Sequence, residues 1–307
     1  MIKKIELGNT GIYVPNIAVG CMRIPGQTEK ETEEFITTAL DSGLNFFDHA
    51  DIYGGGVCEE KFGKAVKSLA LDRESITVQT KCGIVPGKMF DFSKEHIIES
   101  VEGSLRRLGT DYIDILLLHR PDALVEPEEV AEAFTYLHDR GMVKNFGVSN
   151  QKPYQIELLK RAIPYELCAN QMQFGLGHSF MVSSGMCANM DDKFSLEREG
   201  GILDYSRLHG MTLQAWSPLL YGFFAGNILT DEKFAPLRVK MAEVAEKYSI
   251  SLSAVAFAWI LRHPAKMQVV SGTSRADRIR ELALASDVRL TREEWYTLHL
   301  SAGNILP

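Results

Sequence analysis

The sequence predicts an α/β fold, a (β/α)8 or TIM barrel made by a single domain over residues 1–307. Short apolar segments alternate with helical patterns along the whole chain, and the composition does not shift between them. Most of these segments are nearly continuous apolar runs, as expected for parallel strands covered on both faces. At this length two domains of about 150 residues are also conceivable, and the unbroken alternation favours one barrel.

Eight segments are the predicted barrel strands. They are residues 17–21, 45–50, 75–81, 112–119, 143–150, 167–174, 211–218 and 267–273. Ahead of them, residues 3–14 favour a β-hairpin that turns at Asn9-Thr10-Gly11. We expect this N-terminal hairpin to plug the bottom of the barrel.

The predicted helices have recognisable ends. Thr28-x-x-Glu31 and Thr291-x-x-Glu294 have the spacing of capping boxes ahead of an apolar period. Two further helices are predicted within residues 93–109 and 127–141, each followed by a stop glycine. Their shared apolar faces consist of Ile97, Val101, Leu105 and Leu108 in one and Val130, Phe134 and Leu137 in the other.

Two segments depart from the regular alternation. Residues 175–193 carry Gly and Met without a clear period, and residues 220–233 carry several aromatic side chains. Loops of this length in a compact barrel are usually functional or disordered. Because both segments follow strands, we expect long loops at the C-terminal face, where barrel enzymes build their sites.

Charge and cysteine content narrow the class of protein. The net charge of −7 argues against nucleic acid or an anionic membrane surface as the main partner. No apolar run approaches the ~18 residues of a membrane span. The five cysteines are odd in number and form no C-x-x-C pair, so we expect reduced thiols, no metal site and a cytoplasmic location. Cys58 and Cys82 are the two thiols that could be reactive.

Ionisable side chains gather where the predicted strands end. Asp48 and Tyr53 close the second strand, Lys81 the third and His119 the fourth, so the barrel brings them to one mouth. A Lys ammonium near a Tyr favours the phenolate and lowers the pKa of the phenol. An Asp paired with that Lys keeps it charged, and a His can orient a carbonyl oxygen. With no metal triad or nucleophile–base pair in the set, the chemistry it favours is hydride delivery to carbon with protonation of the oxygen.

Two other chemistries are compatible with these residue types. Lys81 could form a Schiff base, as strand-end lysines of barrel aldolases do, but pairing with Asp48 would keep it protonated and a poor nucleophile. His49, Asp51 and His119 could suggest a metal cluster, but His-x-Asp is too short to indicate one without further His ligands.

Seven stretches in order resemble the aldo-keto reductase family, and the resemblance covers essentially the whole chain. They are NFFDHADIYG, TKCG, DYIDILLLHRPD, FGVSN, ANQMQF, AWSPL and VVSGTSRADRIREL. Each is weak alone, whereas seven at barrel spacing are specific. The residues DHADIYGG and LLLHRPD, at the first and third of these stretches, resemble a bacterial oxidoreductase branch of the family.

The resemblance implies that Tyr53 is the general acid, that Asp48 and Lys81 tune it, and that His119 orients the substrate carbonyl. It also implies NADP(H) as cofactor. The residues it assigns to that cofactor are Ser149, Asn150 and Gln171 for the carboxamide, Trp216 and Met22 for the nicotinamide ring, Ser217, Pro218 and Leu219 for the pyrophosphate, and Gly272, Thr273, Ser274, Arg275 and Arg278 for the adenosine end. Arginine suits a 2′-phosphate, which favours NADPH over NADH.

The chain departs from the family pattern at two places. Gly272-Thr273 stands where many members carry Lys-Ser, so one charged phosphate contact is lost. His49 stands where Thr or Ser is common, and its role is left open.

The predicted function is therefore NADPH-dependent reduction of an aldehyde or ketone to the alcohol. The alternative is an NADP(H)-binding sensor or regulatory subunit with vestigial turnover, like the channel-associated relatives of this family. We expect a small carbonyl substrate and a monomer or weak homo-oligomer. An apolar or aromatic substrate is suggested by the aromatic loop residues Phe90, Phe180, Tyr221, Phe223 and Phe224.

Overall fold

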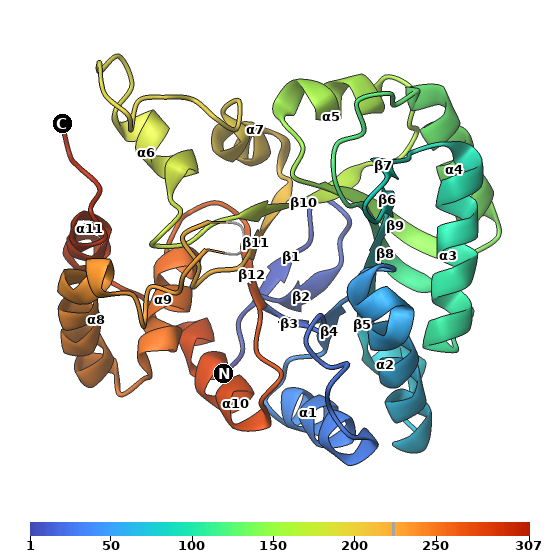
Figure 1. Cartoon of the computed structure of the whole chain (residues 1–307), viewed down its shortest axis with the longest axis horizontal. Helices are drawn as coiled ribbons and strands as arrows, with labels where there is room; N and C mark the ends of the chain where they lie inside the picture. The colour runs from blue at the N-terminus through green and yellow to red at the C-terminus, as the bar shows by residue number, and fades with distance from the viewer. Residues whose placement is uncertain (223–224) are drawn as a thin grey trace.

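Eight parallel strands close into a barrel in the computed structural model, which describes residues 1–222 and 225–307 (Figure 1). Their order around the barrel follows the chain, and the last strand pairs with the first. The strands are β3 (Ile17–Gly20), β4 (Phe46–Asp48), β5 (Thr77–Cys82), β8 (Ile113–Leu118), β9 (Val143–Ser149), β10 (Leu167–Gln173), β11 (Thr212–Trp216) and β12 (Met267–Ser271). All eight predicted strands and the predicted fold class are confirmed.

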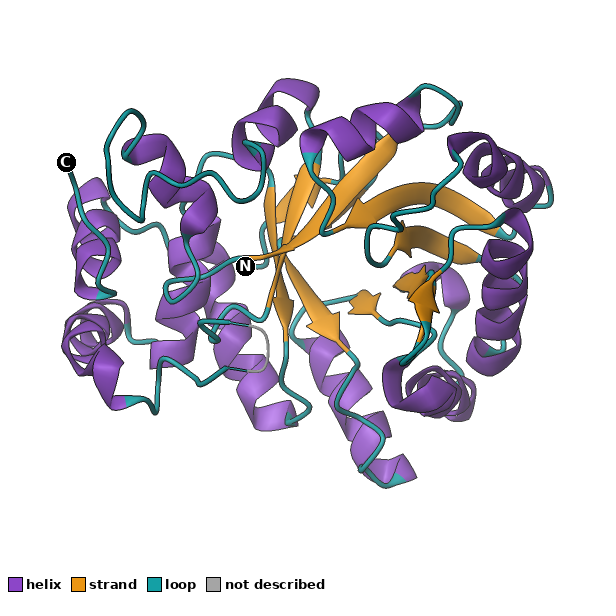
Figure 2. Ribbon diagram, turned by 45° about the horizontal axis from the view of Figure 1, so that its top comes forward, coloured by secondary structure: helices purple, strands orange, loops and turns teal. Residues whose placement is uncertain are grey.

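Helices surround the barrel (Figure 2). They are α1 (Glu29–Asp41), α2 (Val57–Ser68), α3 (Lys94–Leu108), α4 (Pro127–Asp139), α5 (Pro153–Lys160), α6 (Phe180–Met186), α7 (Ile202–His209), α8 (Ala235–Tyr248), α9 (Leu252–Leu261), α10 (Ala276–Ala283) and α11 (Arg292–Ser301). Short 3₁₀ turns lie at Tyr53–Gly56, Arg73–Ser75, Glu232–Phe234 and Leu284–Asp287. Both predicted capping boxes form, at the starts of α1 and α11.

The helix faces predicted from apolar spacing pack against the strands. Ile97, Val101 and Leu108 of α3 are buried, and α3 ends at Gly109 with a left-handed φ of 65°. Val130, Phe134 and Leu137 of α4 are buried in the same layer. The main core therefore lies between the outer face of the barrel and the helices.

A second, smaller core fills the barrel at the amino ends of its strands. The hairpin of β1 (Lys4–Glu6) and β2 (Tyr13–Pro15) contributes the buried side chains of Leu7 and Val14 to it. They pack with Ala18, Phe46 and Cys168 inside the barrel. The predicted N-terminal plug is confirmed, and the opposite end of the barrel is left as the mouth.

Two segments at the mouth, residues 175–193 and 83–92, contain short secondary structure that their sequences do not indicate. Residues 175–193 contain α6, and residues 83–92 form a hairpin of β6 (Ile84–Val85) and β7 (Met89–Phe90). These elements are too short to give a periodic pattern. Of the aromatic residues suggested for the substrate, Phe90 is 46% exposed, and Tyr221 is tied to Asp231 by a 2.7 Å hydrogen bond. Phe223 and Phe224 lie outside the described residues.

Within the described ranges no single helix is both long and apolar enough to cross a membrane. Residues Glu232–Tyr248 and Leu252–Leu261 reach that length and apolarity only when joined across a bend of 87°.

All five cysteines are buried free thiols. Burial is the main reason that the pKa of Cys82 lies well above its usual value and that of Cys58 rises to about 11. Since the thiolate is the reactive form, the structure disfavours a reactive role for either residue.

Candidate active site

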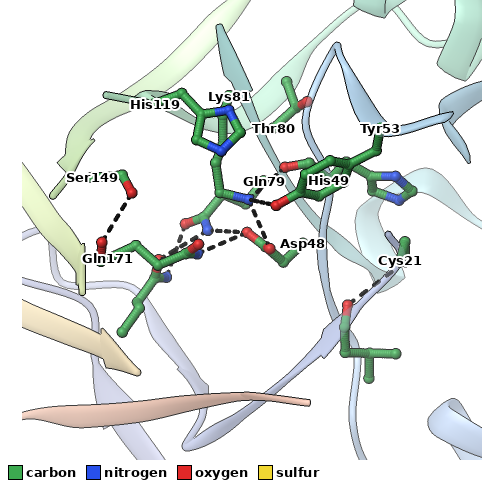
Figure 3. Close-up of polar contacts among 12 residues, drawn as sticks. Cys21, Asp48, His49, Tyr53, Gln79, Thr80, Lys81, His119, Ser149 and Gln171 are labelled. Carbon is green, nitrogen blue, oxygen red and sulfur yellow. Dashed lines mark hydrogen bonds and ion pairs between the residues drawn. The ribbon is translucent and has the colours of Figure 1, made fainter. Parts of the chain in front are cut away.

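Three adjacent strands bring the predicted ionisable residues together at the mouth (Figure 3). Asp48 ends β4, and Lys81 lies near the end of β5. Lys81 Nζ donates to Asp48 Oδ2 at 2.8 Å and to Tyr53 Oη at 3.2 Å. His119 follows β8, and its ring meets that of Tyr53 edge-on at 5.9 Å between centroids. The four predicted side chains thus form one contiguous set.

The turn after β4 sets the position of Tyr53. Residues Tyr53–Gly56 form a 3₁₀ turn in which Gly54 and Gly56 have positive φ of 58° and 96°. A Cβ on Gly54 would lie 2.8 Å from Pro25 Cγ, and one on Gly56 would lie 2.7 Å from Arg107 Cδ. Glycine is therefore required here both by backbone conformation and by space.

The pKa of Lys81 is shifted as expected, whereas that of Tyr53 is not. Burial alone would lower the pKa of Lys81, but Asp48 and Tyr53 raise it above the usual value, so the amine is charged. Burial raises the pKa of Tyr53, and Lys81 only opposes that rise. The expected lowering of the Tyr53 pKa is thus wrong for this structure, because the loss of solvent outweighs the attraction of Lys81. Tyr53 holds its proton at neutral pH.

His119 and the neighbouring His49 are both uncharged at neutral pH. Burial, followed by the positive charges of Lys81 and Arg120, keeps the pKa of His119 well below its usual value. Burial and then Lys81 lower the pKa of His49 to about 3. The His49 ring packs edge-on against Phe62 of α2 at 4.6 Å between centroids. The side chain of His49, whose role the sequence leaves open, thus contacts a covering helix.

The residues expected around the nicotinamide carboxamide are linked by hydrogen bonds. Ser149 Oγ donates to the backbone carbonyl of Gln171 at 2.9 Å, and Asn150 Nδ2 donates to Ser149 Oγ at 2.8 Å. Trp216 Nε1 donates to Asn150 Oδ1 at 3.1 Å. The structure therefore joins these four residues, from the ends of β9, β10 and β11, on one side of the mouth.

The segments expected along the rest of the cofactor also follow strands at this end of the barrel. Ser217, at the end of β11, has a strained φ of 49°, and Pro218 and Leu219 continue from it. Met22 follows β3 and is 44% exposed. Gly272, Thr273 and Ser274 lead from β12 into α10.

The two arginines expected at the adenosine end differ in their surroundings. Arg278 is exposed on α10. Arg275 makes two hydrogen bonds to Asp277, one of them from Nε at 3.0 Å. One edge of its guanidinium is therefore engaged by a carboxylate in the first turn of α10.

The alternative chemistries receive no support from these positions. Lys81 is ion-paired with Asp48, as the argument against a Schiff base requires. Among residues 1–222 and 225–307, no group of three or more His, Cys, Asp or Glu side chains could hold a metal ion.

Sequence reasoning missed several polar residues of the mouth. Arg120 follows His119, and its Cζ lies 5.6 Å from the centroid of the Trp216 ring. Gln173 Nε2 is buried with no partner among the described residues. Gln79 donates to Asp48, as does Gln171, which the sequence resemblance already assigned to the carboxamide. Gln79 lies two residues before Lys81 and Gln173 two residues after Gln171, so the period of two along a strand is the signal that could have found both.

Comparisons with known proteins agree on one family. The Aldo/keto reductase family model matches residues 16–300. The oxidoreductase YdhF of Escherichia coli is 33% identical over 98% of each chain. A 6-dehydroglucose reductase of Agrobacterium fabrum is 35% identical over 87% of this chain and 86% of its own length. A thermostable aldo-keto reductase solved with the inhibitor epalrestat is 26% identical, with a TM-score of 0.79 over 98% of this chain and all of its own.

Proposed function

The chain belongs to the aldo/keto reductase family, and on this premise we propose that it reduces an aldehyde or ketone to the alcohol, with NADPH as hydride donor and Tyr53 as general acid. The main support is Lys81 Nζ, which lies 3.2 Å from the Tyr53 phenol and 2.8 Å from the Asp48 carboxylate. A charged lysine at this distance stabilises a phenolate that forms when Tyr53 gives up its proton.

Each member of the set has one part in the proposed step. When bound, NADPH supplies a hydride to the carbonyl carbon. Tyr53 Oη gives its proton to the carbonyl oxygen as negative charge develops there, which yields the alcohol. Lys81 stabilises the phenolate that remains, and Asp48 keeps Lys81 charged. Neutral His119, edge-on to Tyr53, orients the carbonyl oxygen by a hydrogen bond.

The residues on the β9–β11 side of the mouth fit a nicotinamide. Trp216 offers a half-buried ring at the end of β11. Gln173 shares the inward face of β10 with Gln171, and its buried, unpartnered amide nitrogen suits a polar ligand group. We assign Ser149, Asn150 and Gln171 to the carboxamide. Arg278 is the residue best placed for a 2′-phosphate, because Arg275 is engaged by Asp277.

We propose that residues 1–307 act as one domain on a small carbonyl substrate, as a monomer or weak homo-oligomer. The relative named a 6-dehydroglucose reductase adds sugar aldehydes to the apolar and aromatic carbonyl compounds worth testing.

The test is NADPH oxidation with a panel of aromatic, aliphatic and sugar aldehydes and ketones, for the wild type and Tyr53→Phe. We expect turnover by the wild type and a loss of at least about 100-fold in the variant, the lower end of what a general acid contributes. NADPH binding, followed by quenching of tryptophan fluorescence, should be unchanged. Tyr154→Phe is the matched control, because Tyr154 is 89% exposed.

Two outcomes would contradict the proposal. Undiminished turnover in Tyr53→Phe would remove Tyr53 as the acid. Tight NADPH binding by a wild type that turns over nothing in the panel would favour the regulatory alternative.

A further inference from the structure

We propose that Gln79 is a positioning residue for the reaction, holding the Asp48 carboxylate so that Lys81 stays aligned with Tyr53. The inference rests on the proposed function. Gln79 is fully buried and two residues before Lys81 on β5, so the two side chains share the inward face of that strand. Gln79 lies one layer deeper in the barrel than Lys81.

The two residues hold different oxygens of one carboxylate (Figure 3). Gln79 Nε2 donates to Asp48 Oδ1 at 2.6 Å, and Lys81 Nζ donates to Asp48 Oδ2 at 2.8 Å. Gln171 Nε2 adds a second bond to Oδ1 at 3.0 Å. A carboxylate held at both oxygens cannot turn about its terminal torsion, which is otherwise soft.

The direction of these amide groups is fixed independently at both ends of the chain, because the Asp48 carboxylate and the Pro15 carbonyl can only accept. Gln268 Nε2 donates to the backbone carbonyl of Pro15 at 2.7 Å, and a carbonyl can only accept. Gln268 Oε1 is thereby left to accept from Gln214 Nε2 at 2.8 Å. Gln214 Oε1 in turn accepts from Gln79 and Gln171. The chain of amides runs from the N-terminal hairpin to Asp48 with every bond paired donor to acceptor.

The same network gives Gln171 a second task beside its proposed contact with the cofactor. Its two amide hydrogens point to Asp48 and Gln214, at 3.0 and 3.1 Å. Gln171 therefore offers the mouth only its side-chain oxygen, which can accept from a carboxamide N–H. Gln79, which touches neither substrate nor cofactor in this scheme, is the cleaner place to test positioning.

The experiment compares three variants by melting temperature, NADPH binding and single-turnover reduction of the best substrate of the panel. Gln79→Met keeps the shape and removes both donors. Gln79→Glu keeps the shape and can donate only when protonated. Gln268→Met removes an equally buried amide at the far end of the chain and leaves the Gln79–Gln214 pair and both bonds to Asp48 in place.

The pH readout of Gln79→Glu depends on the groups around this position. The charged ones are Asp48 of β4 and Lys81 of β5, and the neighbouring side chains of β10, β11 and β12 are neutral amides. Other titratable groups at this end of the barrel include Tyr53, His119, His49, Asp51, Arg120 and the Cys21 thiol. An ionised carboxylate at position 79 repels Asp48, whereas a protonated one can donate to it.

We expect Gln79→Met to lower the hydride-transfer rate about 10- to 100-fold, the range seen when groups that orient metal ligands are removed, with NADPH affinity unchanged. The rate of Gln79→Glu relative to wild type should rise as the pH falls. Gln268→Met should melt earlier but keep its rate.

Two results would overturn the inference while leaving the proposed function intact: a Gln79→Met rate equal to that of the wild type, or equal rate losses in Gln79→Met and Gln268→Met. Absence of turnover in the wild type would instead refute the proposed function and the inference with it.

Discussion

Lys81 and Asp48 form an ion pair deep in the mouth of the barrel, with Nζ 2.8 Å from Oδ2 and side-chain exposures of 0% and 3%. Removing two charges from water costs about as much as their attraction returns, so such a pair adds little net stability compared with apolar residues. Its position beside Tyr53 instead suits a role in the chemistry.

Lys81→Met should remove turnover and lower the free energy of unfolding by about 3–5 kcal/mol, because the Asp48 charge is left buried without its partner. The double variant Asp48→Asn with Lys81→Met should regain most of the stability and none of the turnover. Urea unfolding and NADPH oxidation measure the two effects.

The matched control is Lys94→Met, which removes a lysine whose side chain is 38% exposed in its pair with Glu132. We expect a change below about 1 kcal/mol for it. If Lys81→Met were as stable as Lys94→Met, the buried pair would not be intact in solution.

Asp51 should make the protein less stable as the pH rises. Burial and the neighbouring Glu59 raise the pKa of Asp51 from 3.8 to about 7. Between these values the folded protein holds a proton that the unfolded chain has released, so stability falls as the pH increases from about 4 to 7. The free energy of unfolding of Asp51→Asn should rise relative to that of the wild type over this range, by roughly 2–4 kcal/mol at pH 7. Denaturant unfolding at several pH values measures this, with exposed Asp111→Asn as the matched control, and a difference between Asp51→Asn and the wild type that does not change with pH would contradict it.

His49 should make the protein less stable as the pH falls, the opposite of the effect of Asp51. Its pKa is lowered from 6.5 to about 3, mainly by burial, so the unfolded chain binds a proton below pH 6.5 that the folded protein refuses. The contribution of His49 to stability is present above that pH and is lost as the pH falls toward 3. The stability of His49→Leu relative to the wild type should therefore be higher at pH 4.5 than at pH 7. A thermal melt at both pH values decides this, with exposed His138→Leu as control.

The Arg275–Asp277 pair should limit affinity for NADPH. Asp277→Asn frees the guanidinium that now bonds to that carboxylate, so we expect tighter NADPH binding and unchanged NADH binding. Arg278→Ala should weaken NADPH binding about tenfold, equivalent to about 1.4 kcal/mol. Titrations of both cofactors by tryptophan fluorescence provide the measurement. Parallel changes for NADPH and NADH would show that neither arginine contacts a 2′-phosphate.

Much of the fold could be predicted because its determinants are local. Nearly continuous apolar runs such as residues 112–119 predict covered parallel strands, and Thr28 with Glu31 predicts a helix start. The small elements at the mouth could not be predicted in this way. Strands β6 and β7 have two residues each, and α6 has seven, so none of the three spans enough residues to show a period.

The sequence by itself determined that Asp48, Tyr53, Lys81 and His119 would share one mouth, because each follows or ends a strand and parallel barrel strands all end on the same face. Only the tertiary structure decided the state of these groups. Burial depends on how the surrounding elements close, and it reversed the expected direction of the Tyr53 pKa. Closure also brought Gln79, Gln171, Gln214 and Gln268 from four strands into one hydrogen-bonded chain beneath Asp48. Such contacts join residues up to 135 positions apart, so no local pattern in the sequence encodes them.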